Sequence, residues 1–589
     1  MVIKRWLSVR SYSVRCILLF CAAFLLFLSG CSSVKNVQAP DSGQTKPLTV
    51  GVERQTTEGI VIGEENSATN TISWKSIPYA RPPVGDLRWK APQPPQKRSA
   101  ALKATTFCDI CPQYADHDFN TATPQVISGN EDCLYLNIWS PMKATGNLPV
   151  FFWIHGGGNS IQWPLLSRHD GGFLANKGNM VVLTVNYRLG PMGFFNHPAL
   201  KTGDEAGDSG NFGILDLIAA LKWVQTNIKN FGGNPGNVTI AGESAGATNV
   251  FCLVSSPMAK GLFHRAISET GSPKPSTPAQ GAEHMNGIIA KLLVKDGKAA
   301  DAKAAAAMLA AMSAKDVEVY IRSKKAQDFL ELYPEGKGMG MITFPSIFGD
   351  GKVLPKDFYA AMESGNYNKV PMILGSNKEE LKLFLSAFPQ FASWRNDQSL
   401  FKDPAKLEIY DLSAKYLSDG WKEMAVDYPA SLMRGNSDQP MIFTYQFLWG
   451  AGGAKNNVID PPFNMLLGAC HVMEIDFVFG TKIWLGERVF NEKNRAGRVA
   501  LSNAMMDYWS EFARTGKPNR DQSGLPIWSP WSNIKGQPKT ILLDADLEKI
   551  KIAMSNIELT LGDIEAALKA EPRQKEIQPA WNGSRFRRR

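Results

Sequence analysis

The stretch Val238-Thr239-Ile240-Ala241-Gly242-Glu243-Ser244-Ala245-Gly246 decides the fold of this 589-residue chain. The apolar run predicts a buried strand, and the G-x-S-x-G pattern that follows predicts a sharp turn with a serine at its tip. Glycine is needed two residues before and after the serine, because larger side chains would collide with the strand or the next helix. Such a turn lifts the Ser244 hydroxyl into a cleft. Taken alone, the five residues also fit an ordinary glycine-rich turn.

A second apolar run, Val150-Phe151-Phe152-Trp153-Ile154, is followed by His155-Gly156-Gly157-Gly158. Three consecutive glycines let backbone N–H groups point into a cavity without obstruction by side chains. The loop would donate these groups to the negative oxygen of a tetrahedral intermediate, where one donor stabilises the transition state by about 2.7–4 kcal/mol. A flexible linker is the alternative, but a linker does not normally follow so apolar a strand.

A nucleophilic serine needs a base, and the chain has only seven histidines. Where a serine in such a turn is the nucleophile, the partners follow in the order serine, acid, histidine. The histidines after Ser244 are His264, His284 and His471. His264 lies in a segment that resembles a helix surface, and His284 lies in a polar, alanine-rich helical stretch. His471 precedes an apolar segment, 475–479, and is the best candidate for the base.

The acid must lie between the serine and the histidine. Val370-Pro371-Met372-Ile373-Leu374 predicts a buried strand, and Glu379 and Glu380 follow shortly after it. A carboxylate just past the C-terminal end of a strand lies at the ligand-binding edge of an open α/β sheet. Position alone leaves both glutamates as candidates.

These motifs, with several others, make the chain similar to the type-B carboxylesterases, the carboxylesterase/cholinesterase family of α/β-hydrolases. The resemblance covers about residues 50–545. It implies one large α/β domain: a central, mostly parallel, twisted sheet with helices on both faces. Large helical insertions, including residues 281–330, would form a cap over an active-site gorge. The other motifs that carry the resemblance are Ile77-Pro78-Tyr79-Ala80, Glu131-Asp132-Cys133-Leu134-Tyr135-Leu136-Asn137, Asn186-Tyr187-Arg188-Leu189-Gly190 and Phe231-Gly232-Gly233-Asn234-Pro235.

The resemblance also implies a serine hydrolase that cleaves carboxylic esters through an acyl-enzyme intermediate. The family's acid motif places its glutamate at Glu380. No metal or organic cofactor is needed. The implied site comprises the triad Ser244, Glu380 and His471, an oxyanion hole formed by the N–H groups of Gly157, Gly158 and Ala245, and Glu243 as a pocket carboxylate. A structural hydrogen-bonding role under the turn is an equal alternative for Glu243.

The sequence departs from the family pattern at three places. Leu381 stands where the family usually has a glycine after the acid, and Leu217 where glutamine is common. Asn159-Ser160-Ile161 replaces the usual aromatic residue and glycine after the glycine loop, so the pocket there is expected to differ in shape.

The family comparison further suggests a disulfide between Cys111 and Cys133, although Cys108 could compete for Cys133. Cys252 and Cys470 are expected to be free and buried. Cholinesterases of the family place a tryptophan in this disulfide loop to bind quaternary ammonium. Residues 112–132 contain no tryptophan, which argues against choline esters. Other small-molecule esters stay open.

The N-terminus predicts export. Four basic residues precede the apolar segment Cys16 to Leu28, which is typical of a secretion signal over residues 1–30. Leu28-Ser29-Gly30-Cys31 resembles a bacterial lipoprotein box, in which Cys31 becomes lipidated; a conventional signal peptide with an incidental cysteine is the alternative. Residues 31–49 suit a flexible tether. We therefore expect a lipid-anchored membrane protein of the bacterial cell envelope that faces the periplasm or the exterior.

The formal net charge of +9 does not indicate nucleic-acid binding. Four positive charges lie in the signal and four in the last five residues, so the body is close to neutral. Residues 546–589 are expected to form a C-terminal amphipathic helix, over 548–570, and a basic tail. Two other functions stay possible: a catalytically inert binding or adhesion protein of the same fold, and a lipase acting on long-chain triglycerides. The sequence leaves the oligomeric state open.

Overall fold

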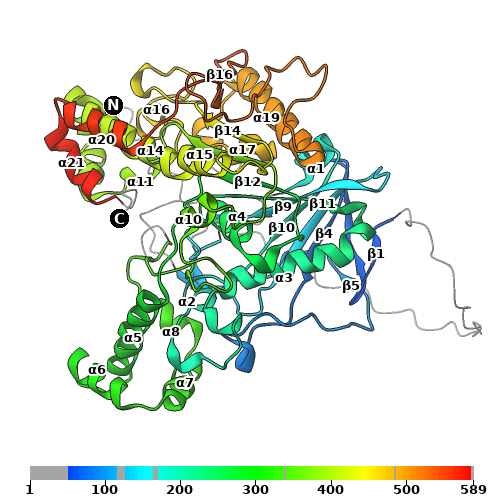
Figure 1. Cartoon of the computed structure of the whole chain (residues 1–589), viewed down its shortest axis with the longest axis vertical. Coiled ribbons are helices and arrows are strands. Elements are labelled where there is room, and N and C mark those ends of the chain that lie inside the picture. The colour runs from blue at the N-terminus through cyan, green and yellow to red at the C-terminus, as the bar shows by residue number, and fades with distance from the viewer. Residues whose placement is uncertain (1–50, 116–125, 163–169, 337–339, 483–485, 585–589) are drawn as a thin grey trace, which may run out of the picture. The chain divides into compact units, whose positions relative to one another are not determined.

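The computed structural model describes residues 51–115, 126–162, 170–336, 340–482 and 486–584. Its centre is an eleven-stranded sheet with the strand order β16-β15-β14-β13-β12-β11-β9-β10-β8-β4-β3 (Figure 1). The strands are β3 Glu64–Asn66, β4 Thr71–Pro78, β8 Tyr135–Pro141, β9 Leu148–Ile154, β10 Val181–Val185, β11 Gly233–Glu243, β12 Arg265–Glu269, β13 Met372–Asn377, β14 Ile442–Phe447, β15 Thr540–Leu543 and β16 Ala553–Ser555.

The strands from β10 to β15 in this order are parallel, whereas the outer strands at both edges pair antiparallel. The strand order reverses between β9 and β11. From β9 the chain continues to β10 on one side, and from β11 it continues to β12 on the other. Open α/β sheets bind ligands in the crevice at such a point, beyond the carboxyl ends of the strands. The loops that follow β9 and β11 therefore flank the expected ligand crevice.

Every residue of β9 is buried because helices cover both faces of the sheet. Val150, Phe152 and Ile154 belong to one core, which includes α3 (Phe212–Asn227) and α4 (Ala245–Ser255). Phe151 and Trp153 belong to a second core, with α1 (Gly172–Gly178), α17 (Ile475–Phe479) and α19 (Arg495–Thr515). The mostly parallel sheet with helices on both faces agrees with the prediction.

Further helices extend this framework. The helix-rich character predicted for residues 281–330 is confirmed: α5 Pro278–Lys295, α6 Ala302–Ala311, α7 Ala314–Arg322 and α8 Ala326–Leu330 form a lobe at the lower left of Figure 1. A third core joins α14 (Pro404–Lys422) to α20 (Leu561–Ala570) and α21 (Gln574–Asn582). The other helices are α2 Gly190–Gly193, α10 Phe358–Glu363, α11 Lys382–Leu385, α12 Pro389–Asn396, α13 Ser399–Lys402, α15 Tyr428–Arg434, α16 Phe463–Leu466 and α18 Gly486–Val489. Smaller sheets contain β1 Glu53–Thr56, β2 Gly59–Ile62 and β5 Leu102–Lys103, and β6 Gln113–Ala115 with β7 Val126–Ser128.

The C-terminal region differs from the prediction of one helix over 548–570. Ile550, Ile552 and Met554 pack against the second core at every second position, which is the period of a strand. Residues 553–555 accordingly form β16 at the edge of the central sheet, and α20 begins only at Leu561. The sheet therefore extends past the boundary expected at residue 545.

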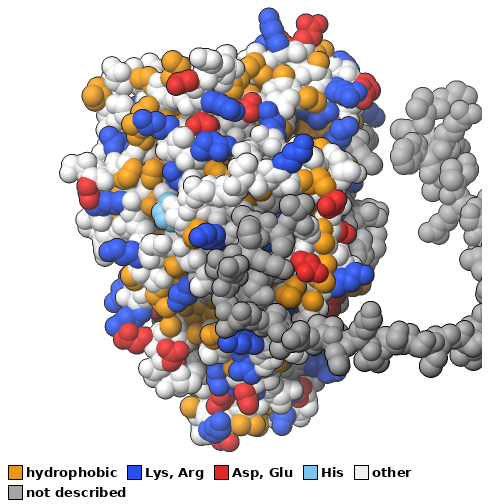
Figure 2. All heavy atoms as spheres, turned by 90° about the vertical axis from the view of Figure 1, so that its right-hand side faces the viewer, with side chains coloured by type: hydrophobic (Ala, Val, Ile, Leu, Met, Phe, Trp, Pro, Cys, Tyr) orange, Lys and Arg blue, Asp and Glu red, His pale blue; other side chains and the backbone are white. Residues whose placement is uncertain are grey.

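Acidic and basic side chains are interspersed on the face shown in Figure 2. In the described ranges, every helix is too short or too polar to cross a bilayer. The signal, the tether with Cys31, and the terminal arginines from Arg585 onward lie outside the described residues.

Candidate active site

Ser244 lies at the tip of the turn between β11 and α4, and its backbone is strained. Its φ of 57° and ψ of −122° are outside the regions that residues with a Cβ usually adopt. Glycine is required on both sides of the turn. A Cβ on Gly242 would lie 2.6 Å from the backbone oxygen of Ile154, and one on Gly246 would lie 2.0 Å from the same atom. The strand, turn and helix that the sequence pattern predicts are therefore present.

The loop after β9 runs directly against this turn. A Cβ on Gly156 would lie only 3.0 Å from the Cβ of Ser244. Gly157 and Gly158 have φ angles of 98° and 64°, which glycine adopts without strain. Among the described residues, no acceptor takes a hydrogen bond from the backbone N–H of Gly157, Gly158 or Ala245. These three groups are available to an oxygen atom of a ligand.

Polar side chains that the sequence pattern does not indicate support this loop. The Tyr187 hydroxyl lies 2.9 Å from the backbone oxygen of His155 and 3.1 Å from Oδ1 of Asn159. Asn249 of α4 donates a hydrogen bond of 2.9 Å to the same Asn159 oxygen. Burial lowers the pKa of His155 to about 4, so its ring is neutral at pH 7. The Asn159 that departs from the family pattern thus links the glycine loop to the helix behind Ser244.

His471 and Glu380 form a buried pair. Nδ1 of His471 lies 2.6 Å from Oε2 of Glu380. The other carboxylate oxygen accepts hydrogen bonds from the Thr270 hydroxyl, at 2.6 Å, and from the backbone N–H of Asn377. Contacts on both oxygens fix the plane of the carboxylate and, through it, the orientation of the imidazole.

Glu379, the other candidate acid, points elsewhere. It pairs with the buried ammonium of Lys382 at 3.0 Å and accepts a hydrogen bond of 3.1 Å from the backbone N–H of Ala469. Its Oε2 would lie 1.8 Å from a Cβ on Gly468, so it fills space at that glycine. Of the two neighbouring glutamates, the geometry brings Glu380 alone to the imidazole.

The second nitrogen of His471 faces Glu243. Nε2 lies 3.1 Å from Oε1 of Glu243, and within the described residues it makes no hydrogen bond to Ser244. Burial, with the neighbouring carboxylates of Glu380 and Glu269, raises the pKa of Glu243 well above its usual range. A hydrogen bond from Ser244 to this nitrogen would replace the contact with Glu243. Hydrogen bonds between such partners often tighten only when substrate is present.

Further buried carboxyl groups lie close to Glu243 and Glu380. Burial raises the pKa of Glu269 to about 8, and Trp509 donates its indole N–H to that carboxyl at 2.8 Å. Glu474 accepts a hydrogen bond from the side-chain amide of Asn377, and burial raises the pKa of Glu474 well above its usual range. In both groups, burial favours the protonated form of the carboxyl. No local signal in the sequence indicates either group: Glu269 lies between Ser268 and Thr270, and Glu474 is two residues from Asp476.

A disulfide joins Cys111 to Cys133, with an S–S distance of 2.06 Å. Cys108, the competitor considered above, is a free thiol whose pKa burial raises to about 11. Cys252 and Cys470 are free and buried, in agreement with the prediction.

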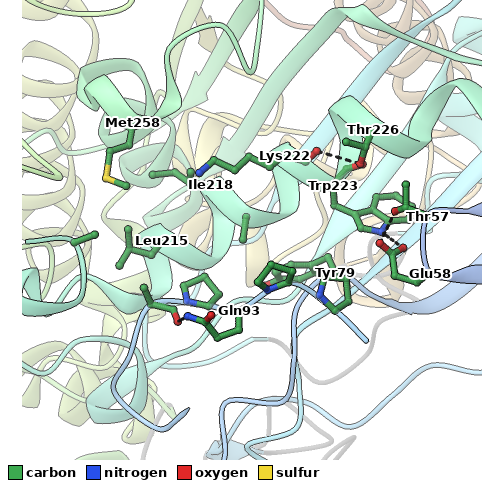
Figure 3. Close-up of a pocket in the computed structure, with 16 residues that line it drawn as sticks. Thr57, Glu58, Tyr79, Gln93, Leu215, Ile218, Lys222, Trp223, Thr226 and Met258 are labelled. Atoms are coloured by element: carbon green, nitrogen blue, oxygen red, sulfur yellow. Dashed lines mark hydrogen bonds between the residues drawn. The ribbon is translucent and has the colours of Figure 1, made fainter. Parts of the chain in front are cut away.

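A separate cavity of about 400 Å³ lies beside α3 (Figure 3). Its lining includes Leu215, Ile218 and Trp223, and the Trp223 indole N–H donates to Oε2 of Glu58 at 3.1 Å. None of the candidate site residues lines this cavity.

The chain is similar to known esterases over most of its length. The model of the carboxylesterase family matches residues 51–429 and 403–559. The para-nitrobenzyl esterase of Bacillus subtilis is 32% identical over 80% of this chain and 91% of its own length. The cocaine esterase of Homo sapiens is 33% identical over 81% of this chain and 85% of its own length.

Solved structures of esterases have the same architecture. A para-nitrobenzyl esterase structure superposes with a TM-score of 0.63 at 30% identity, covering 86% of this chain and 98% of the other. The carboxylesterase EST55 of Geobacillus stearothermophilus gives a TM-score of 0.65 at 28% identity, covering 88% and 99%. The chain therefore belongs to the carboxylesterase family and is a carboxylic-ester hydrolase with the α/β-hydrolase fold.

Proposed function

We propose that the chain hydrolyses esters through an acyl-enzyme intermediate on Ser244, with His471 as general base and Glu380 as the third member of the triad. The contact of 2.6 Å between Nδ1 of His471 and Glu380 carries this proposal. It fixes the tautomer in which Nε2 is free to accept the serine proton.

In the first step, Oγ of Ser244 attacks the ester carbonyl carbon while its proton passes to Nε2 of His471. The carbonyl oxygen becomes an oxyanion, which accepts hydrogen bonds from the N–H groups of Gly157, Gly158 and Ala245. Collapse of this intermediate breaks the bond to the alcohol oxygen, and His471 gives that oxygen its proton. In the second step a water molecule loses a proton to His471 and attacks the acyl carbon. The bond between that carbon and Oγ of Ser244 then breaks, His471 returns the proton to Oγ, and the acid leaves.

The variant Ser244→Ala tests this proposal. We expect loss of p-nitrophenyl acetate turnover and loss of labelling by a fluorophosphonate, because the attacking oxygen is gone. Ser364→Ala, a change at an exposed serine, is the matched control and should keep both. Undiminished turnover in purified Ser244→Ala would overturn the proposal. An inactive parent protein would point to an inert binding protein, and a clear preference for emulsified long-chain triglycerides would point to a lipase.

We further propose that the substrates are esters of uncharged alcohols. The disulfide loop, residues 112–132, supplies no tryptophan on which a quaternary ammonium group could bind. Acetylcholine and its neutral isostere 3,3-dimethylbutyl acetate form a direct test. The neutral ester should have the higher kcat/KM, and the reverse order would contradict the proposal.

We also propose that the protein is exported and lipid-anchored through Cys31. The basic N-terminus, the short apolar segment and Leu28-Ser29-Gly30-Cys31 support this. Labelled fatty acid should enter the parent chain expressed in a bacterium but not the variant Cys31→Ser, and detergent-phase partition should follow the label. Secretion of an unlabelled parent would instead indicate a conventional signal peptide.

A further inference from the structure

An aromatic ring lies flat on the imidazole of His471. Trp421, in the last turn of α14, has its ring centroid 4.9 Å from that of His471, with 30° between the planes. Phe384 also contacts the imidazole, at 5.2 Å and 46°. The face of an indole attracts positive charge. An imidazolium formed under Trp421 would therefore be more stable than one formed without it.

The backbone that carries Trp421 has an unusual turn. After Lys422, α14 continues into a π-helical segment, η8, over Glu423–Asp427, before α15 begins. Residues five apart point about 140° from each other in an α-helix, but a π turn brings them to the same side. Nζ of Lys422 lies 2.6 Å from Oδ2 of Asp427, and both side chains are buried. The π turn thus allows this ion pair to form, and Lys422, one of its members, is the residue next to Trp421.

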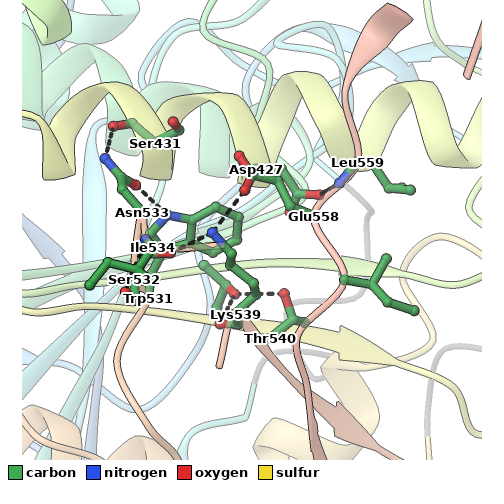
Figure 4. A network of polar contacts seen from close by, with 12 residues as sticks. Asp427, Ser431, Trp531, Ser532, Asn533, Ile534, Lys539, Thr540, Glu558 and Leu559 are labelled. Atoms are coloured by element: carbon green, nitrogen blue, oxygen red, sulfur yellow. Dashed lines mark hydrogen bonds and ion pairs between the residues drawn. The ribbon is translucent and has the colours of Figure 1, made fainter. Parts of the chain in front are cut away.

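A C-terminal segment, at Leu559, contacts the end of this π turn. The backbone N–H of Leu559 donates a hydrogen bond of 2.7 Å to Oδ2 of Asp427. In Figure 4 the adjacent Glu558 lies beside Lys539, which it pairs with at 2.8 Å. We call the Lys422–Asp427–Leu559 contacts the clamp. They connect a residue 14 positions past the expected end of the catalytic domain to the helix that touches the imidazole.

We propose that Trp421 is a positioning residue for ester hydrolysis: held by the clamp, its indole keeps the His471 ring in line with Glu380 and stabilises that ring when it carries the serine proton. The inference rests on the triad of the proposed function. In the part of the chain that the structure describes, the charged groups in contact with the imidazole nitrogens are Glu380, at Nδ1, and Glu243, at Nε2. Neither is changed in the variants below.

Trp421→Leu and Trp421→Phe test the role of the aromatic face. In Trp421→Leu we expect kcat to fall about threefold to tenfold, with KM for a small ester within about twofold. The acidic limb of the pH profile of kcat/KM should move to lower pH, because the protonated imidazole loses its aromatic partner. Trp421→Phe keeps a ring and should restore most of kcat and the original limb. Trp394→Leu, a change at a half-buried tryptophan that packs on Phe391, is the control and should change neither quantity.

An unmoved acidic limb in Trp421→Leu, or a Trp421→Phe variant as impaired as Trp421→Leu, would overturn the proposal. If Ser244→Ala is inactive at the same time, either result would contradict only the role of Trp421, and the proposed triad would stand. A fully active Ser244→Ala would instead remove the triad on which the proposal depends.

The clamp is tested by removing both charges together, because Asp427→Asn alone leaves the buried Lys422 without a partner and can prevent folding. We expect the double variant K422M/D427N to fold and to move kcat and the acidic limb in the same direction as Trp421→Leu. The double variant K539M/E558Q removes both charges of the neighbouring ion pair and leaves the clamp, so it should keep kcat and the acidic limb at the parent values. A double variant with the parent's kcat and pH profile would show that the clamp does not act through Trp421.

Discussion

Backbone geometry positions Ser244 and the glycine loop, whereas buried polar and aromatic side chains position His471 and Glu380. On the serine side, a positive φ and glycines with no room for a Cβ define the turn. On the histidine side, Thr270, Trp421 and several carboxyl groups come from distant parts of the chain. The turn at Ser244 and the glycine loop should therefore lose their geometry when side-chain volume is added. The pair His471–Glu380 should lose its function when charge or hydrogen bonding is changed.

The largest effect should come from adding one methyl group to the serine side. In Gly246→Ala the new Cβ would lie 2.0 Å from the backbone oxygen of Ile154. Because backbone must move to relieve this contact, we expect a loss of stability of about 1–3 kcal/mol or more and a loss of kcat of about 100-fold or more. The measurements are thermal unfolding and steady-state kinetics.

Gly287→Ala is the control for this change. Gly287 lies inside α5 with open space around its Cα, so alanine should be neutral or should stabilise the helix by up to about 1 kcal/mol. A Gly246→Ala protein as stable and active as Gly287→Ala would show that the close approach of β9 to the turn is not needed.

The next effect separates the two neighbouring glutamates. Glu380→Gln should lower kcat by about 10²–10⁴-fold with little change in KM, because a neutral amide stabilises the imidazolium poorly and can favour the wrong tautomer. Glu379→Gln, in contrast, should lower the thermal stability through the buried Lys382 and keep most of kcat. If the two variants exchange these properties, Glu379 is the acid and the assignment made above is wrong.

The last effect is on stability alone and depends on pH. Burial raises the pKa of Glu269 to about 8, well above that of a carboxyl in the unfolded chain. Folding therefore holds a proton that the unfolded chain releases, so this group's contribution to stability is fully present below about pH 4.5 and is lost as the pH rises to 8. Glu269→Gln removes the titration and keeps an acceptor for Trp509.

The difference in Tm between Glu269→Gln and the parent should thus increase steadily between pH 5 and pH 8. The corresponding change in the free energy of unfolding is on the order of a few kcal/mol. Glu283→Gln, at an exposed position of α5, should show a constant difference over the same range. A Tm difference for Glu269→Gln that does not change with pH would mean that Glu269 is ionised in the folded protein throughout.

The same contrast decides how much could be predicted from the sequence. The turn at Ser244 and the glycine loop depend on residues within a few positions of each other, so their patterns could be recognised directly. Thr270 and Trp421 meet the pair Glu380–His471 only because the sheet and α14 bring distant segments together, and no local pattern indicates such contacts. The C-terminal strand β16 was missed for a related reason: its three residues, Ala553–Ser555, become a strand only beside β15.

The position of Leu559 near the end of the chain has a consequence for synthesis. A ribosome delivers β9 and β11 long before it delivers the residue that closes the clamp. A nascent chain can thus form the strained serine turn early, while α14, which carries Trp421, still lacks the hydrogen bond from Leu559 to Asp427. Fragments that end before this residue would carry a complete nucleophile next to an incompletely held base.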